Sequence, residues 1–365
     1  MNYPIPSLPL QYDLETVNVL RHLNAANRKL AELKGLAHTI PNEDILISSL
    51  ALQEAKDSSA IENIVTTQDD LYRAGIETNT QLISPATKEV LFYREAIYTG
   101  FNKVRSQRLL TLNDIKQIQQ ILVQNSAGFR TTPGTQLKRS NDGAVIYTPP
   151  QDIAEIERYM TNLEQFINDD SISSLDPLIK MAIIHHQFES IHPFYDGNGR
   201  TGRIINILYL VLSGMLDIPI LYLSRYITHN KTDYYRLIQA IRDKNTDNAA
   251  QWEDWIVFML QGIETTATDT IELVKQIGAI MDYFKSVMRP AFGSKYNHQL
   301  LNSLFYYPYT KIEHIATNMQ VSRPTATKYL ENLVSLGLLE KSHIGRENYY
   351  INTQLYNLFA NYNSE

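Results

Sequence analysis

The chain has 365 residues, of which 44% are hydrophobic and 20% are charged, and its formal net charge is −6. This composition predicts a well-packed globular protein of two or three domains, and it excludes a surface that binds a polyanion along the whole chain. Cysteine is absent from the sequence, so disulfide frameworks and cysteine metal sites are excluded. We expect a cytoplasmic protein without a membrane segment, because the start lacks the pattern of a signal peptide and no apolar run could span a bilayer.

The first part of the chain favours helices. Apolar residues recur at helical spacing over 14–36, 41–63, 84–104 and 111–125. Pro41 with Asn42, and Ser84 with Pro85, are typical entry signals of helices. Residues 128–151 differ, because they are rich in Gly, Pro, Thr and Asn and only 144–148 favour a strand. We therefore expect a hairpin or flap there.

Helices are predicted again in the second half. The ranges are 152–169, 176–191, 204–216, 229–243 and 249–288. Asp176 is the expected N-cap of its helix, with Pro177 at the first helical position. The helix over 249–288 is long enough to connect two parts of the molecule, and the pattern breaks at residues 290–294.

Residues 192–203, "HPFYDGNGRTGR", contain the glycine spacing of a dinucleotide fingerprint and nearly that of a P-loop. Both motifs require a strand before the glycines. The preceding segment, 176–191, instead has the cap, length and periodicity of a helix. Asp217 lies about where the ribose-binding acid of a dinucleotide fold would stand, but the missing strand outweighs it. The sequence therefore predicts a helix–loop–helix.

Such a loop would bind an anion. Gly197 and Gly199 allow successive N–H groups to point toward one place, and the start of the next helix faces the same place. Arg200 and Arg203 are three residues apart and could grip phosphate through two hydrogen bonds each. Asp196 is the one carboxylate at the rim and would suit Mg²⁺. His192 could accept a proton near neutral pH.

The same twelve residues match in full the motif of the Fic family (filamentation induced by cAMP), His-Pro-Phe-x-Asp/Glu-Gly-Asn-Gly-Arg-x-x-Arg. The chain is thus similar to mainly helical proteins that mostly transfer AMP from ATP to a protein hydroxyl. The resemblance implies that His192 deprotonates the hydroxyl, Asp196 holds Mg²⁺ or Mn²⁺, and Phe194 anchors the loop. It also implies that Arg203 contacts the terminal phosphate. The residues that would contact the nucleotide are Gly197, Asn198, Gly199, Arg200, Thr201, Gly202 and Arg203.

Two further segments resemble parts of that family. Residues 144–152 resemble the hairpin that pairs with the target by β-augmentation, with Val145, Ile146 and Tyr147 as the target-binding flap. Residues 233–243 resemble a downstream helix that helps to bind the nucleotide. The candidates on that side are His229, Asn230, Tyr234, Tyr235 and Arg242.

An inhibitory helix is expected upstream. Ser58 and Glu62 are four residues apart on one face of a predicted helix, and Asn63 follows. Taken alone, they form an ordinary polar edge. They also match the Ser/Thr-x-x-x-Glu-Gly/Asn pattern of inhibitory helices in many Fic proteins. The resemblance implies that Glu62 pairs with Arg203 and removes the clamp for the γ-phosphate.

His185, His186 and Glu189 could be read as metal ligands, since His185 and Glu189 are four residues apart. A zinc site needs a third ligand and a reason for it. We prefer a helix that packs behind the loop, with polar side chains that orient it.

The C-terminal residues, 297–365, resemble a winged helix-turn-helix, whose second helix would enter a DNA groove. The candidate DNA-binding residues are Arg323, Thr325, Thr327, Lys328 and Arg346. Five basic and five acidic residues make this segment neutral, whereas DNA binding normally needs a basic footprint. Docking of a protein is the alternative.

We therefore predict a mainly α fold, with a Fic-type helical core and a β-hairpin flap. The predicted domains are an N-terminal helical region (1–110, inhibitory helix near 50–66), a catalytic core (111–265), a connecting helix (266–296) and a winged helix (297–365). The predicted function is an autoinhibited adenylyltransferase that uses ATP and modifies Ser, Thr or Tyr of a target protein or of itself, with a homodimer expected from the family. The alternatives are a DNA-binding regulator that senses nucleotide or target, and a Fic enzyme with another transfer or AMP-removal activity.

Overall fold

The computed structural model describes residues 5–76, 83–139, 143–243, 248–344 and 347–362. These residues are mainly helical, with two small antiparallel sheets, so the prediction of a mainly α fold is confirmed. None of the described helices combines the length and apolar character that are needed to cross a membrane. The helix entry signals are also confirmed, because Ser84 and Asp176 cap their helices and Pro85 and Pro177 follow at the first helical positions.

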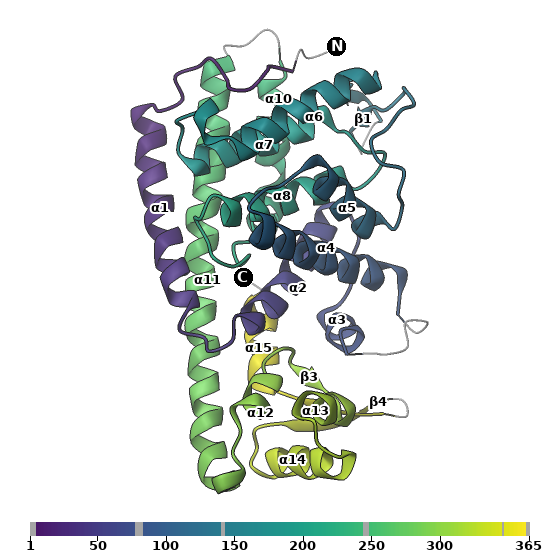
Figure 1. Ribbon diagram of the computed structural model, residues 1–365, viewed down its shortest axis with the longest axis vertical. Coiled ribbons are helices and arrows are strands. Elements are labelled where there is room, and N and C mark those ends of the chain that lie inside the picture. The colour runs from purple at the N-terminus through teal and green to yellow at the C-terminus, as the bar shows by residue number, and fades with distance from the viewer. Residues whose placement is uncertain (1–4, 77–82, 140–142, 244–247, 345–346, 363–365) are drawn as a thin grey trace.

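Helix α11 (Asn248–Phe292) runs along most of the molecule, and α1 (Val17–Ala37) packs along it (Figure 1). The predicted break at residues 290–294 is therefore placed slightly too early. Pro290 lies in the last turn of α11, where a missing N–H removes only one hydrogen bond near the helix end. The helix continues to Phe292 and ends in the 3₁₀ turn Gly293–Lys295.

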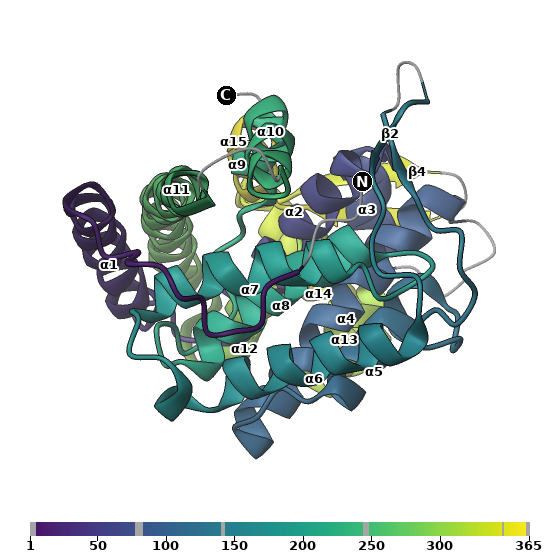
Figure 2. The same cartoon turned by 90° about the horizontal axis from the view of Figure 1, so that it is seen from above.

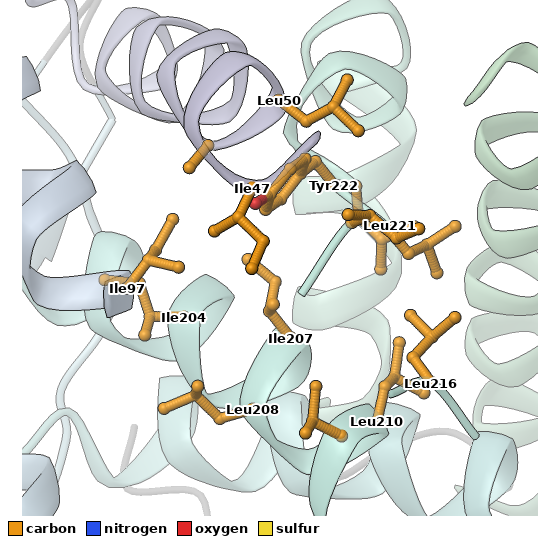
Figure 3. Close-up of a cluster of buried hydrophobic side chains, with 14 of the residues drawn as sticks. Ile47, Leu50, Ile97, Ile204, Ile207, Leu208, Leu210, Leu216, Leu221 and Tyr222 are labelled. Atoms are coloured by element: carbon orange, nitrogen blue, oxygen red, sulfur yellow. The ribbon is translucent and has the colours of Figure 1, made fainter. Parts of the chain in front are cut away.

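The central body is a group of helices on one side of α11 (Figures 1 and 2). Its members are α2 (Glu43–Ile61), α3 (Gln68–Ala74), α4 (Pro85–Gln107), α5 (Leu112–Val123), α6 (Ile153–Asn168), α7 (Pro177–Ile191), α8 (Asn198–Leu212), α9 (Ser224–His229) and α10 (Lys231–Ile241), with a 3₁₀ turn at Asp170–Ile172. Helix α8 lies in the middle and packs against α4, α5 and α7. Figure 3 shows the aliphatic core around it, formed by Ile204, Ile207, Leu208 and Leu210 of α8 with Ile97, Ile47 and Leu50 of neighbouring helices.

Helix α2 is buried on all its faces. Every residue from Ile45 to Ala55 is buried, which is typical of a helix enclosed by protein rather than one at a surface. One side of α2 packs against α4, α8 and α9. On its other side, Asn42 Nδ2 donates to Tyr306 Oη at 2.8 Å, just ahead of the helix. This helix of the central body therefore contacts the C-terminal segment at its N-terminal end.

The predicted flap is a short hairpin that projects from the helices (Figure 2). Its strands are β1 (Leu137–Lys138) and β2 (Val145–Tyr147), with Leu137 opposite Tyr147 and Lys138 opposite Val145.

The C-terminal segment, residues 298–362, has the helix–turn–helix–hairpin order that the sequence predicts. It comprises α12 (His298–Ser303), β3 (Tyr309–Thr310), α13 (Ile312–Met319), α14 (Arg323–Ser335), β4 (Glu340–Ile344), β5 (Glu347–Ile351) and α15 (Thr353–Tyr362). The strand order is β3-β5-β4, and all pairs are antiparallel. The buried ring of Tyr72 on α3 packs against Tyr309, Tyr356 and Phe359, so this segment is docked on the central body through an aromatic cluster.

Candidate active site

The loop 192–197 joins α7 to α8 through two left-handed residues. His192 is the C-cap of α7 with φ 48° and ψ 59°, and Gly197 precedes α8 with φ 78° and ψ 10°. Glycine adopts this region at little cost, whereas histidine stays there only when its surroundings hold it. A Cβ atom at Gly197 would lie 2.7 Å from Val123 Cγ1, so the loop passes α5 too closely for a side chain.

Asn198 and Phe194 fix the loop internally. Asn198 Oδ1 accepts the N–H of Phe194 at 2.9 Å, and its Nδ2 donates to the Phe194 carbonyl at 2.8 Å. The Phe194 ring is buried against Phe129 and Phe188. Phe194 thus anchors the loop as expected. The side chain of Asn198 is used within the loop, so only its backbone N–H, at the helix start, is left for a ligand.

The N-terminus of α8 has the geometry that the predicted anion cradle requires. The first N–H groups of a helix have no acceptor within the helix, and they carry its positive dipole end. A Cβ atom at Gly199 would lie only 2.5 Å from Glu62 Oε1 and 3.1 Å from Arg203 Nη1. Glycine at 199 therefore lets a carboxylate or phosphate oxygen approach this helix end closely.

The pairing predicted between Glu62 and Arg203 is present. Arg203 Nη2 donates to Glu62 Oε1 at 2.9 Å and to the Ser58 carbonyl at 2.9 Å, and its Nε donates to Ser58 Oγ at 2.7 Å. The Arg203 side chain is buried, whereas that of Glu62 is 37% exposed. Burial alone would raise the pKa of Glu62, but the charge of Arg203 outweighs it and holds that pKa below its usual value.

The end of α2 is closed at Glu62 and Asn63. Asn63 has φ 64° and donates its N–H to the Ala60 carbonyl at 3.0 Å, so its contribution is to end the helix. Lys231 of α10 donates its Nζ to the Ile61 carbonyl at 2.7 Å. The last turn of α2 is therefore held from α10 as well as from α8.

Arg200 pairs with other residues than Arg203 does. It is buried, and its Nη1 donates to Glu89 Oε2 on α4 at 2.9 Å. Its Nη2 lies 3.7 Å from Asp196 Oδ1. The two arginines of the predicted clamp thus have different partners: Arg203 pairs with Glu62, and Arg200 lies between α4 and the loop.

Asp196 fits the role of a magnesium ligand next to phosphates. Its side chain is 75% exposed, and Oδ1 accepts the N–H of Gly197 at 2.6 Å. Among the described residues no group of three or more metal-binding side chains is found. Mg²⁺ is commonly bound by one or two carboxylates together with substrate phosphates and water, and a single exposed aspartate fits such a site.

The His192 imidazole is half-buried, and its Nδ1 has no hydrogen-bond partner among the described residues. Burial, followed by the charges of Arg242 and Arg130, lowers the pKa of His192 to about 3. The ring is therefore neutral at neutral pH, and in the free protein it is a weak base.

The helix behind the loop carries buried polar groups. His185 Nε2 lies 2.7 Å from Tyr234 Oη and its Nδ1 lies 2.9 Å from Asn206 Nδ2. Glu189 is half-buried beside Gly202, and desolvation raises its pKa to about 7. Both ring nitrogens of His185 thus serve helix packing, which agrees with the interpretation that α7 supports the loop.

The residues predicted to bind the nucleotide at positions 229–242 differ in exposure and in their partners. Tyr234 and Arg242 are buried, and Arg242 stacks 4.0 Å from the ring of Tyr147. Tyr235 is 44% exposed, and burial and then the Glu62 charge raise its pKa to about 12. His229 and Asn230 bond to α9 carbonyls through their side chains. Tyr235 thus combines an exposed ring with a pKa that the Glu62 charge raises.

The three predicted flap residues also differ in exposure. Val145 and Ile146 are 47% and 37% exposed, so they can be offered to a partner strand. Tyr147 is buried and donates its hydroxyl to the Ser190 carbonyl at 2.7 Å. Its position anchors the hairpin to α7.

In the C-terminal segment, Arg323 and Lys328 are exposed on α14 as predicted. Arg323 is paired with Glu313 at 2.6 Å, which neutralises its charge. Thr325 and Thr327 are partly buried and bond locally to Ser322 and Arg323. Arg346 lies outside the described residues.

Sequence reasoning missed three residues around the site: Glu89, Lys231 and Arg130. Glu89 and Lys231 look like ordinary charged positions on helices, and nothing in the sequence pairs them with Arg200 and with the end of α2. Arg130 stands in the "GFR" that precedes the flap, and its fully buried guanidinium donates to the His192 carbonyl at 2.8 Å. The one sequence signal for Arg130 was a charged residue at the base of the predicted flap.

Three family models match this sequence. Residues 20–102 match "Fic/DOC family N-terminal", residues 109–210 match "Fic/DOC family", and residues 280–355 match "Protein adenylyltransferase SoFic-like, C-terminal domain". The chain belongs to the Fic/DOC family. The Fic match includes α5, the flap, α7, the loop and most of α8.

Among curated proteins, the chain is similar to "Protein adenylyltransferase Fic" of Drosophila ananassae, with 25% identity over 186 residues, which cover 46% of this chain and 35% of that protein. It is also similar to "Protein adenylyltransferase fic-1" of Caenorhabditis briggsae, with 38% identity over 55 residues, covering 15% of this chain and 11% of that protein. The chain thus spans about a third or less of these relatives' length.

Among solved structures, a Fic family protein from Desulfovibrio desulfuricans matches with a TM-score of 0.56 and 18% identity, covering 92% of this chain and 96% of that one. Fic-1 from C. elegans matches with a TM-score of 0.52 and 18% identity, covering 70% and 73%. At these identities the likeness concerns the Fic fold.

Proposed function

We propose that this Fic protein transfers the AMP moiety of ATP to a hydroxyl group of a target protein or of itself, and that Glu62 keeps it inhibited. The observation that carries the proposal is that one loop joins a neutral histidine, the N-terminus of a helix and a buried arginine. The names of the curated relatives, which are protein adenylyltransferases, support the same activity.

In the proposed reaction, the hydroxyl oxygen of the acceptor attacks the α-phosphorus of ATP. A bond forms between that oxygen and the α-phosphorus, and the bond from the α-phosphorus to the oxygen bridging to the β-phosphate breaks. Pyrophosphate leaves, and the hydroxyl proton passes to His192. The pKa of His192 is low in the free protein. The negative charge of bound phosphates would raise it and make the imidazole a better base.

The N–H groups at the start of α8 would bind the phosphates, as helix N-termini do in other phosphate sites. Asp196 would hold a Mg²⁺ ion that enters with ATP and neutralises phosphate charge. Arg203 would grip the γ-phosphate through two hydrogen bonds once Glu62 has left it. The exposed Val145 and Ile146 would pair with a segment of the target, which brings its hydroxyl toward His192.

The inhibition follows from competition for Arg203. The carboxylate of Glu62 and a γ-phosphate are both anions that use the same guanidinium, so they exclude each other. ATP would then bind without its terminal clamp, in a pose that does not favour attack at the α-phosphorus.

The test is incubation of the Glu62→Gly protein with α-labelled and γ-labelled ATP in parallel, with candidate acceptors and without them. Label that reaches protein from the α position alone is the expected result. Addition of His192→Ala to this variant should abolish the transfer, because loss of a general base typically costs about 10²–10⁴-fold, while ATP binding should persist. Label that arrives from the γ position would instead mean phosphate transfer, and transfer that survives His192→Ala would remove the histidine from its role.

A further inference from the structure

The C-terminal end of α7 is capped by the stem of the flap. The last carbonyl groups of a helix have no N–H partner within the helix. Here the consecutive carbonyls of Ser190, Ile191, His192 and Pro193 all accept hydrogen bonds from only two residues of the flap stem, Arg130 and Tyr147. Tyr147 bonds to the first of them, and Arg130 bonds to the other three.

Arg130 makes most of these bonds. Its Nε donates to the His192 carbonyl at 2.8 Å and its Nη2 to the Ile191 carbonyl at 3.4 Å. Its backbone N–H donates to the Pro193 carbonyl at 2.8 Å, and its Nη2 also donates to the Pro150 carbonyl at the far end of the flap. One residue thus connects both ends of the flap to the loop that carries His192.

We propose that Arg130 is a positioning residue for His192: its guanidinium fixes the left-handed backbone of the histidine and links it to the strand that would receive the target. This inference rests on the proposed function, because positioning matters only if His192 acts as the base.

The burial of Arg130 supports a specific role. Its residue exposure is 1%, and no ion pair of Arg130 occurs among the described residues. A buried charge without an acid partner is costly, so the carbonyl groups must compensate its lost hydration. These carbonyls belong to the turn at His192, where a non-glycine residue with φ 48° needs support from its neighbours. The cost of burying Arg130 and the strain at His192 are therefore reduced by the same hydrogen bonds.

The flap is tied to the loop at a second point. The backbone N–H groups of Thr131 and Thr132 donate to Tyr195 Oη at 2.9 and 3.0 Å. Arg130 thus bonds to the carbonyls that precede Phe194, and Thr131 and Thr132 bond to the hydroxyl of Tyr195, which follows it. These hydrogen bonds leave the stem of the flap little freedom relative to the loop. Through Arg130, a target segment bound to β2 would therefore be held in a fixed position relative to His192.

The experiment compares Arg130→Lys and Arg130→Gln in the Glu62→Gly background, with Arg158→Gln on the exposed face of α6 as the matched control. Lysine keeps the charge but loses the forked donor. Both substitutions at Arg130 should lower kcat by roughly 10²-fold, the effect of misplacing a catalytic group by about 1 Å, with the KM for ATP unchanged. Arg158→Gln should alter neither.

A second readout does not depend on activity. His192 is one of nine histidines, and a His192→Gln variant assigns its ring signals in a spectrum of ¹⁵N-histidine-labelled protein. Arg130→Lys should shift the His192 signals while those of exposed histidines such as His229 stay in place. If Arg130→Gln does not fold, Tyr147→Phe, which removes only the bond to the Ser190 carbonyl, should give a smaller shift in the same signals.

The outcomes separate the two proposals. If the Glu62→Gly protein transfers no AMP to any acceptor, the proposed function fails, and the His192 signals still decide whether Arg130 positions the ring. If transfer occurs, but Arg130→Lys leaves kcat within twofold and the His192 signals unmoved, the role of Arg130 is overturned.

Discussion

Arg203 Nη2 lies 2.9 Å from Glu62 Oε1, although the two residues are 141 positions apart in the chain. The guanidinium is buried, whereas the carboxylate is partly exposed at the end of its helix. The arginine is therefore fixed and the glutamate is the partner that can leave. This asymmetry makes the pair suitable for a switch in which an anionic ligand replaces the carboxylate.

Glu62→Gly should raise AMP transfer about 10- to 100-fold, because a hydrogen bond to a charged group contributes roughly 1.5–3 kcal/mol that ATP would no longer have to displace. Ser58→Ala should give a smaller increase, since the Ser58 carbonyl still binds Arg203. Transfer of α-label from ATP is the measurement. In the Glu62→Gly, Arg203→Ala double variant the gain should disappear, and a double variant that keeps the gain would contradict the proposed inhibition.

Asp196→Ala should abolish Mg²⁺-dependent transfer. The other groups at the helix start are mainly N–H donors, which cannot bind a cation, and the Glu62 carboxylate beside them is paired with Arg203. Calorimetric titration of ATP with and without Mg²⁺ provides the check: the substitution should remove the dependence of affinity on the metal. The exposed Glu157→Ala on α6 serves as the control for a lost surface charge. An unchanged Mg²⁺ dependence in Asp196→Ala would exclude this residue as the ligand.

Glu54→Gln should make stability less sensitive to pH. Glu54 accepts hydrogen bonds from Tyr93 and Ser224, and burial raises its pKa to about 7 from an ordinary value of 4.5. The folded protein thus keeps a proton that the unfolded chain releases near pH 4.5, so this group's contribution is full below that pH and is lost as the pH rises to about 7. Denaturant unfolding between pH 5 and 8 should therefore show a smaller decline for Glu54→Gln than for the wild type. Equal slopes for both proteins would mean that Glu54 is ionised throughout.

If α14 reads DNA, charge reversal at Arg323 and Lys328 should weaken binding and lower the log–log salt slope by about 0.9 per lost phosphate contact. Lys328 should account for most of the change, because Arg323 is already paired with Glu313. Gel-shift assays over a range of salt concentrations would measure the slope. Failure of the wild-type protein to bind its own promoter DNA at low salt would favour protein docking.

The sequence was sufficient for the loop, because its chemistry lies in twelve consecutive residues that follow a capped helix and include the start of the next one. The pairing of Glu62 with Arg203 was predictable only through the family pattern, since no local rule relates residues so far apart. The Arg200–Glu89 contact shows the limit, because nothing distinguishes Glu89 from other charged residues on α4. Its selection depends on how α4 packs against α8.

The residues on the nucleotide side show a second limit. Tyr234 and Arg242 were predicted from the resemblance of residues 233–243 to a nucleotide-binding helix, in which a tyrosine could stack on a base and an arginine could bind a phosphate. The same properties let them pack inside the protein, where Tyr234 meets His185 and Arg242 stacks on Tyr147. Helical periodicity separates inward from outward positions, but not the core from a binding cleft.

The enclosure of α2 on all sides has a kinetic consequence. The helix cannot move as a rigid body without disrupting its packing against α4, α8 and α9 and the hydrogen bond of Asn42 to Tyr306, so Arg203 is freed most easily by fraying of the last turn, from Ser58 to Glu62. Fraying of one turn is fast and reversible, whereas the buried remainder of the helix should exchange its amide hydrogens only on global opening. Basal transfer would then report the fraction of molecules whose last turn is open, and each change of about 1.4 kcal/mol in that equilibrium alters the fraction tenfold. Temperature, mild denaturant or a single poor helix former near residue 60 would thus act as graded activators without any ligand.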